Sequence, residues 1–286
     1  MHSVLEQARA ICNADPVLAA LLPDVPGAIE ITECEIDSKD VRFATNMERD
    51  PIQRSHRNKR FFEPQELDLM RTYLPKGGTF LDIGANVGNH SLYAGLFCQA
   101  GRLIPFEPNP LAYRLLVLNL VMNGLQDQTV FDYVGFGASD VDAEGFAMTD
   151  RQKNLGAARM VAGEGEIATL RPDDFLTDET PHFIKIDVEG MEMEVLRGLQ
   201  KTIRRTRPVL LVEVDRANIH DFADWRLANG FELPASIKHY KENRNFLCVP
   251  EERGDDLSVP DARARDAAAK LFAGRKAAAP RKEGRG

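Results

Sequence analysis

The residues with the clearest chemical potential lie in a turn at positions 80–89. A short apolar run there contains an acid and is followed by glycines and an asparagine at alternate positions, namely Asp82, Gly84, Asn86 and Gly88. Glycines between a strand and a helix let a nucleotide-like ligand approach the backbone, with the N–H groups of the helix N-terminus directed at it. A second apolar run ends in Glu107. An acid roughly 20 residues after such glycines can accept hydrogen bonds from both hydroxyls of a ribose, so the spacing predicts a nucleotide-type cofactor site.

The same turn distinguishes between two cofactors. A dinucleotide site normally reads G-x-G-x-x-G, but Asn86 stands at the second glycine position. Asp82 would repel a pyrophosphate, because like charges are costly in a cleft of low dielectric constant, whereas it would attract the sulfonium cation of S-adenosylmethionine. The residues therefore favour S-adenosyl-L-methionine, with a dinucleotide-dependent oxidoreductase as the alternative. The glycines could also serve only to pack a helix closely against a strand.

A second group of acids could carry out catalysis. The apolar run 183–186 places Asp187 at its carboxyl end, Glu189 follows near the start of a helix, and Glu213 ends another apolar run. Methylation of a hydroxyl needs an acceptor oxygen in line with the methyl group and a group that takes its proton; a general base adds about 10²–10⁴-fold. We assign this catalysis to these three acids and expect Asp187 to orient the hydroxyl or remove its proton. Capping of the following helix by Asp187 and Glu189 is the structural alternative.

Other side chains leave more than one interpretation open. Oxygen ligands such as Asp187, Glu213 and Asp215 suit Mg²⁺ or Ca²⁺, but they show no compact ligand spacing, so the sequence leaves a metal unknown. His90 and His182 could act as bases near neutral pH, or could be structural. The basic segment 54–60 could meet an anionic substrate over the cleft, or could be a solvated loop.

Alternating strands and helices would position these acids. Apolar runs predict strands at Thr79–Ile83, Arg102–Phe106, 130–134, 183–186 and 209–214, with helices at 88–97, 112–122 and 191–204. Near-continuous apolar strands are typical of parallel sheets covered by helices on both faces, so the fold class is a doubly wound α/β sheet. A helix at 64–74 precedes this region. A last helix is predicted at Ile219–Ala228, followed by a pair of antiparallel strands at Phe231–Ile237 and 246–249. Proline is expected to break a helix at 3–22, and segment 41–59 is expected to be a loop or a cap.

These segments resemble the FkbM-type methyltransferase family. The matching motifs occur in the family's order, at 80–89, 106–110, 118–125 and 184–192, and the resemblance covers about residues 61–250. It implies a class I S-adenosylmethionine-dependent O-methyltransferase with a Rossmann-like seven-strand sheet, mostly parallel, whose last strand is antiparallel. It also implies a hydroxyl acceptor on a carbohydrate or a secondary metabolite.

The resemblance further implies which residues contact the cofactor. Asp82, Gly84, Asn86 and Gly88 would line its methionine side, and Glu107 would bind its ribose. The adenine would lie between Pro108 and Asn109, with Ser139 and Asp140 near its far edge. The segment before Ser139 contains more glycine than the family pattern leads us to expect.

Composition limits the remaining possibilities. The net charge of −8 argues against nucleic acid as a partner, because neutralising phosphates requires clustered Lys and Arg. No apolar stretch reaches the roughly 18 residues of a membrane span, and four scattered cysteines fit a reducing, cytoplasmic location. We expect an N-terminal extension or cap at 1–60, a methyltransferase domain at 61–250 and a mobile tail at 251–286. The partner would be a small-molecule or glycan acceptor, and the protein a monomer or homodimer. A catalytically silent binding protein with the same fold is a further alternative.

Overall fold

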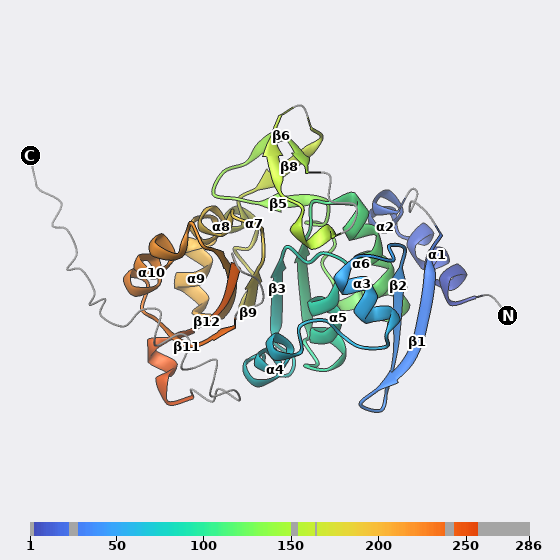
Figure 1. The fold of residues 1–286 in the computed structure, drawn as a ribbon, viewed down its shortest axis with the longest axis horizontal. Coiled ribbons are helices and arrows are strands. Elements are labelled where there is room, and N and C mark those ends of the chain that lie inside the picture. Colours follow the sequence, from blue (N-terminus) through green and yellow to red (C-terminus); the bar gives the residue numbers. More distant parts are fainter. Residues whose placement is uncertain (1–2, 23–27, 150–153, 164, 238–242, 257–286) are drawn as a thin grey trace, which may run out of the picture.

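The protein is built around an open central sheet with helices on both sides (Figure 1). The computed structural model describes residues 3–22, 28–149, 154–163, 165–237 and 243–256. Most of the C-terminal tail that we expect to be mobile, residues 257–286, lies outside these ranges.

The central sheet has six strands in the order β11-β12-β10-β9-β3-β4. Their bounds are Thr79–Ile83 (β3), Arg102–Phe106 (β4), Pro181–Ile186 (β9), Val209–Asp215 (β10), Phe231–Ile237 (β11) and Asn243–Pro250 (β12). β4, β3, β9 and β10 are parallel, whereas β12 runs antiparallel to β10 and β11. The strand order reverses beside β3, with β4 on one side and β9 on the other, and ligands of such sheets bind at this point.

The expected strand at 130–134 is wrong, and within the described residues the central sheet therefore has six strands rather than the expected seven. This segment makes only isolated bridges, between Leu103 and Thr129 and between Glu107 and Val134. The chain turns instead, because the N–H of Val134 donates to Phe131 O and Gly135 takes a φ of +98°. It then leaves the central sheet.

A smaller sheet lies above the carboxyl ends of the central strands (Figure 1). It comprises four strands in the order β5-β8-β6-β7, with bounds Phe136–Ala138 (β5), Ala143–Met148 (β6), Met160–Ala162 (β7) and Ile167–Leu170 (β8). Single-turn 3₁₀ helices occur at Gln126–Gln128 and Leu155–Ala157, and a further 3₁₀ segment occurs at Glu251–Asp256.

Two hydrophobic cores flank the central sheet. Adjacent strand residues alternate between them: Phe80 and Phe183 belong to one, and Leu81 and Ile184 to the other. The first core includes residues of α4 (Pro64–Tyr73), α5 (Asn89–Leu96) and α6 (Pro110–Met122), and the second those of α8 (Glu192–Gly198), α9 (Gln200–Thr206) and α10 (Ile219–Ala228). These layers confirm the doubly wound α/β class.

The single helix expected at 191–204 is divided into α8 and α9. Gly198, at the end of α8, lies so close to the backbone that a Cβ there would be 2.1 Å from Ser139 O. Asp173, in the short α7 (Pro172–Phe175), then accepts the N–H groups of Lys201 and Thr202 at 2.7 and 2.8 Å. Because a carboxylate that accepts the first N–H groups starts a helix, the chain begins a new one here.

The N-terminal region is more ordered than the sequence indicates. A helix pair, α1 (Val4–Ala14) and α2 (Pro16–Leu21), divides at Pro16 as expected. Segment 41–59, expected to be a loop or a cap, is not a loop: it contains most of strand β2 (Lys39–Thr45), paired with β1 (Glu30–Ile36), and helix α3 (Pro51–Arg57). Val41 and Phe43 are buried on alternate positions of β2, which supplies the apolar contact that the polar composition obscures.

Candidate functional site

A cavity opens where the carboxyl ends of the central strands meet the small sheet. It is lined by the turn after β3 (Gly84, Ala85, Asn86), by Glu107 and Pro108 after β4, by Asp187 and Glu189 after β9, and by Glu213 of β10. β5 contributes Phe136, Gly137 and Ala138, and the N-terminal region contributes Pro51 and Ile52. The cavity is therefore at the edge of the sheet where the acids were expected.

The turn after β3 depends on Gly84. Its φ is +81°, and a Cβ there would lie 1.8 Å from the backbone O of Asp187. Gly84 thus permits β3 and β9 to end in direct contact, which brings the cofactor turn beside the carboxylates after β9. Gly88, with a φ of +84°, caps α5 behind this turn and does not line the cavity.

Glu107 connects two backbone segments of the cavity wall. Its Oε2 accepts the N–H of Asn86 and its Oε1 accepts the N–H of Asn109, each at 2.8 Å. The residue is 6% exposed, and burial raises the pKa of Glu107 to about 7, although the two backbone donors oppose this. Each carboxylate oxygen has a further lone pair, so Glu107 can still accept hydrogen bonds from a ligand.

Several residues expected at the cofactor do not line the cavity. Asp82 is fully buried below the turn, where its Oδ2 accepts the hydroxyl of Ser91 at 2.7 Å. Asn109 caps α6, and Asp140 pairs with Arg197 at 2.7 Å. The residues that line the cavity do not include Asp82, Gly88, Asn109, Ser139 or Asp140. β5 ends at Ala138, so that Phe136–Ala138 line the cavity and Ser139 and Asp140 follow beyond it.

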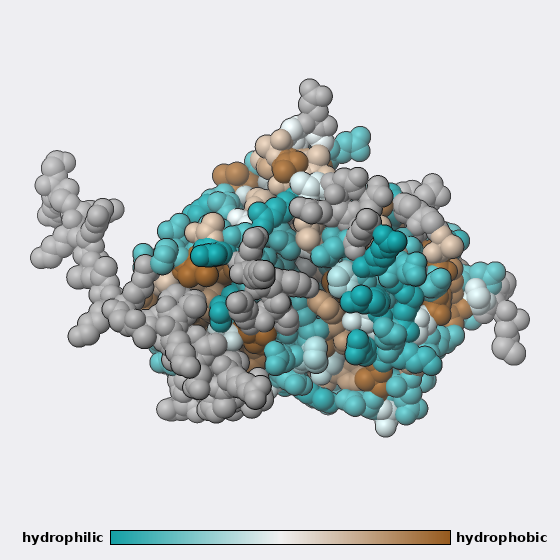
Figure 2. Space-filling model, viewed as in Figure 1, coloured by the Kyte–Doolittle hydropathy of each residue, from teal (hydrophilic) through white to brown (hydrophobic). Residues whose placement is uncertain are grey.

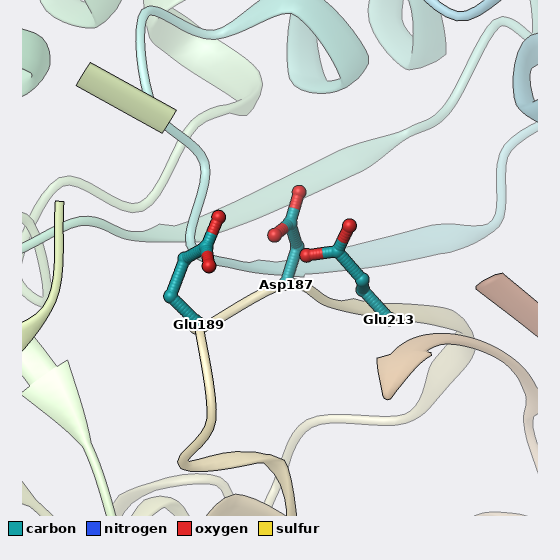
Figure 3. Close-up of side chains that lie close together, drawn as sticks. All are labelled: Asp187, Glu189 and Glu213. Carbon is teal, nitrogen blue, oxygen red and sulfur yellow. The ribbon is translucent and has the colours of Figure 1, made fainter. Parts of the chain in front are cut away.

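Asp187, Glu189 and Glu213 form a compact cluster (Figure 3). One carboxylate oxygen from each lies within 4.8 Å of the others. Burial and the carboxylate of Asp187 raise the pKa of Glu189 to about 7, and the same causes raise the pKa of Glu213 well above its ordinary value. An acidic cluster alone does not define a metal site, and we assign no metal to it. Asp215 lies outside the cluster and pairs with Arg159 at 2.9 Å.

Lys185 also lines the cavity, which the sequence patterns do not predict. Its Nζ lies 2.9 Å from Asp187 Oδ2, and its side chain is 6% exposed. Burial disfavours its charge, but the carboxylates of Asp187, Asp82 and Glu63 outweigh burial and raise the pKa of Lys185. The available signal was a cation inside an otherwise apolar strand, since such a residue is rarely buried without a partner.

The histidines occupy different positions. His90 lines the cavity, with its Nε2 3.5 Å from Oε2 of Glu63. His182 is exposed, and its Nδ1 accepts the N–H of Thr79 at 3.1 Å, which indicates a structural role. His56 is buried, stacks on Phe43 and is 3.1 Å from the side-chain oxygen of Asn89.

The basic segment 54–60 borders a second groove. Arg54, Lys59 and Arg60 line it, and it shares Pro51, Phe62 and Glu63 with the cavity. The surface over α3 is strongly hydrophilic (Figure 2). These exposed cations are thus beside the cavity and not within its lining.

The fold and the site define a class of protein. An open, mostly parallel α/β sheet with a cavity at the carboxyl ends of its strands is typical of Rossmann-like proteins that bind nucleotide-type cofactors. The model of the methyltransferase FkbM domain matches residues 82–247, more than half of the chain. The chain belongs to the FkbM methyltransferase family, as the sequence motifs indicated.

Individual relatives are distant. Hexuronic acid methyltransferase AglP from Haloferax volcanii is 25% identical over 189 residues, which cover 64% of this chain and 75% of the relative. Methyltransferase sdnD from Sordaria araneosa is 26% identical over 162 residues, covering 45% of this chain and 62% of the relative. A solved structure of methyltransferase FkbM from Methylobacillus flagellatus is 18% identical with a TM-score of 0.42, covering 59% of this chain and 43% of that one.

Within the described ranges, no helix is long and apolar enough to cross a membrane bilayer.

Proposed function

We propose that this protein transfers a methyl group from S-adenosyl-L-methionine to a hydroxyl of a carbohydrate or a secondary metabolite. The observation that supports the cofactor best is Glu107, a buried carboxylate in the cavity wall that joins the turn after β3 to the turn after β4. An acid at the end of the second strand can accept hydrogen bonds from both ribose hydroxyls, and the family membership supports methyl transfer.

The residues of the cavity fit this cofactor. Glu107 would hold the ribose, and Gly84 and Asn86 would bring the backbone close to the methionine part. Asp187 provides negative charge in the cavity wall, where a sulfonium cation would be stabilised. When bound, the cofactor supplies an electrophilic methyl group.

Asp187 would act on the acceptor. It lines the cavity at the end of β9, and its carboxylate would accept the proton of the acceptor hydroxyl as the oxygen gains the methyl group. Glu189 and Glu213 have raised pKa values because of burial and the nearby Asp187, so they would contribute protonated carboxyls that hydrogen-bond to it. The small sheet and the N-terminal wall would restrict water.

The acceptor class is supported by a relative. A relative is described as a hexuronic acid methyltransferase, which supports a carbohydrate. We propose a small-molecule or glycan acceptor rather than nucleic acid.

Isothermal titration calorimetry tests the cofactor assignment. We expect S-adenosylmethionine and its demethylated product to bind the full-length protein, and NAD⁺ and NADH not to bind. Glu107→Gln should weaken binding about tenfold, because the amide removes a charge-assisted acceptor and presents its NH₂ group to one of the two backbone N–H donors, those of Asn86 and Asn109. The matched control is Glu35→Gln, an exposed carboxylate on β1. Binding of NADH, or equal affinity in all three proteins, would contradict the assignment.

A methyl-transfer assay tests catalysis. The protein is incubated with isotope-labelled cofactor and a panel of sugars and hydroxylated metabolites, and products are identified by mass spectrometry. Asp187→Asn should reduce the rate about 10²–10⁴-fold with a much smaller effect on cofactor binding. Cofactor binding without transfer to any acceptor in the panel would favour the catalytically silent alternative.

A further inference from the structure

Lys185 occupies a position that an apolar side chain would normally take. It lies in β9, paired with Asp82 of β3 on one side and with Leu211 of β10 on the other. Only 6% of its side chain is exposed, and its ammonium lies 2.9 Å from Oδ2 of Asp187. Burying a charge is costly unless it is paired, so a contact of this kind constrains both partners.

Acidic groups face Lys185 and Asp187 from several elements. Asp82 contributes from β3 and Glu63 from the segment before α4, and both raise the pKa of Lys185. Among the described residues, the other titratable and charged groups around the cluster are Glu107 after β4, Glu189 after β9, Glu213 and Asp215 of β10, His90 of α5 and Arg159 before β7.

Arg159, another cation near the cluster, contacts carboxylates other than that of Asp187. Arg159 pairs with Asp215 at 2.9 Å and lies 3.8 Å from Glu189 Oε2. Lys185 is bonded to Asp187. The geometry therefore gives the two cations different carboxylates.

We propose that Lys185 is the positioning residue of the site: it holds Asp187 ionised and oriented, and so determines which carboxylate of the cluster carries the negative charge. Carboxylates that share a site cannot all ionise easily, and without a cation the proton would be distributed among them. A cation beside one of them separates their roles, leaving a base at Asp187 and protonated neighbours at Glu189 and Glu213. The assignment of Asp187 as the group that takes the proton rests on the proposed function, whereas the effect of Lys185 on its ionisation does not.

Carboxyl NMR tests the proposal without an acceptor. The full-length protein is prepared with ¹³C-labelled Asp and Glu carboxyls and titrated between pH 4 and 9. The signals of the cluster are assigned with Asp187→Asn, Glu189→Gln and Glu213→Gln. In the unsubstituted protein, Asp187 should titrate below both glutamates. Lys185→Met keeps a similar length and removes the charge, and should raise the midpoint of Asp187 by about one pH unit or more, equivalent to about tenfold in proton affinity.

Two further variants complete the test. Lys185→Arg restores the cation and should return the midpoint of Asp187 most of the way. Lys201→Met removes a lysine that is 68% exposed, and should leave the midpoint unchanged. A merely structural lysine would not show this rescue pattern.

Each result bears on the proposal. An Asp187 midpoint above those of the two glutamates overturns it, and this measurement requires only the unsubstituted protein and assignments from the acid variants. An unchanged midpoint in a folded Lys185→Met protein also overturns it. If the midpoints behave as expected but Asp187→Asn transfers methyl groups as fast as the unsubstituted protein, the proposed catalytic role of Asp187 fails and the role of Lys185 stands.

Discussion

Substitution of Gly84 by alanine provides the most direct test of how the cavity is built. The added Cβ would lie 1.8 Å from Asp187 O and 2.9 Å from Asp187 C. Both atoms are backbone, so the conflict cannot be relieved by rotating a side chain. The turn after β3 must therefore separate from the end of β9.

The expected loss in the free energy of unfolding has two parts. A non-glycine residue at positive φ is disfavoured by about 1–2 kcal/mol, and overpacking typically adds about 1–3 kcal/mol. Gly84→Ala should thus lower the free energy of unfolding by about 2–5 kcal/mol. Such a change is a large fraction of the roughly 5–15 kcal/mol that stabilises a typical protein.

Gly77→Ala is a matched control. Gly77 has a φ of +74°, close to the +81° of Gly84, but a Cβ there would meet no atom within 4 Å. Gly77→Ala therefore carries the cost of the positive φ without the cost of overpacking. The difference between the variants should be about 1–3 kcal/mol, or about 2–4 °C in Tm for each kcal/mol.

Urea unfolding and calorimetric titration would measure the two consequences. We expect Gly84→Ala to be less stable than Gly77→Ala and to bind S-adenosylmethionine more weakly, because the turn and the carboxylates no longer meet in the same geometry. If the two variants unfold at the same urea concentration and bind the cofactor equally, the close contact between Gly84 and Asp187 is not present in solution.

Three further predictions concern stability. Burial raises the pKa of Glu107 to about 7 from an ordinary value of 4.5, so the folded state binds more protons than the unfolded state between these two pH values. The free energy of unfolding should therefore fall as the pH rises through this window. Glu107→Gln should remove that part of the pH dependence in urea unfolding at pH 4–8. Asp50→Ala removes the acceptor of two N–H groups, those of Gln53 and Leu155, and should lower the free energy of unfolding by about 2–4 kcal/mol; a loss below that of an exposed Asp→Ala variant would refute this. Asn119→Ala removes an acceptor for the N–H of Ala44, which should increase amide hydrogen exchange at β2 by at least about tenfold; unchanged exchange there would show that the bond is not needed.

Much of the fold could be predicted from local patterns. α10, β3 and β4 have the predicted bounds, because apolar runs there end at clear polar or turn-forming residues. Strand β2 could not be identified so easily, since its first half alternates buried residues with Asp40 and Arg42, which gives the segment a polar composition. Its stability depends on Asn119 of α6 and on Asn123, which follows α6, because both accept N–H groups of the strand from far along the sequence.

In the candidate site, too, some positions follow from local sequence patterns and others depend on contacts between distant residues. Glu107 lines the cavity at the end of β4, and the apolar run before it is enough to predict a strand end there. The charge of Asp82 predicts a position at the cofactor, whereas the residue is buried below the cavity and bonded by Ser91. No sequence pattern indicates that Ser91 bonds to this acid. Lys185 was passed over for a similar reason, since its meaning comes from the distance to Asp187.

Asp50 has a consequence for exchanging parts between relatives. Its two carboxylate oxygens join the start of α3 to Leu155, 105 positions later, and both segments border the cavity. A chimera that receives one segment without the other would mismatch acceptor and donor. The two segments should therefore be exchanged as a pair. A fragment limited to the family match at 82–247 would lack the N-terminal residues that line the cavity.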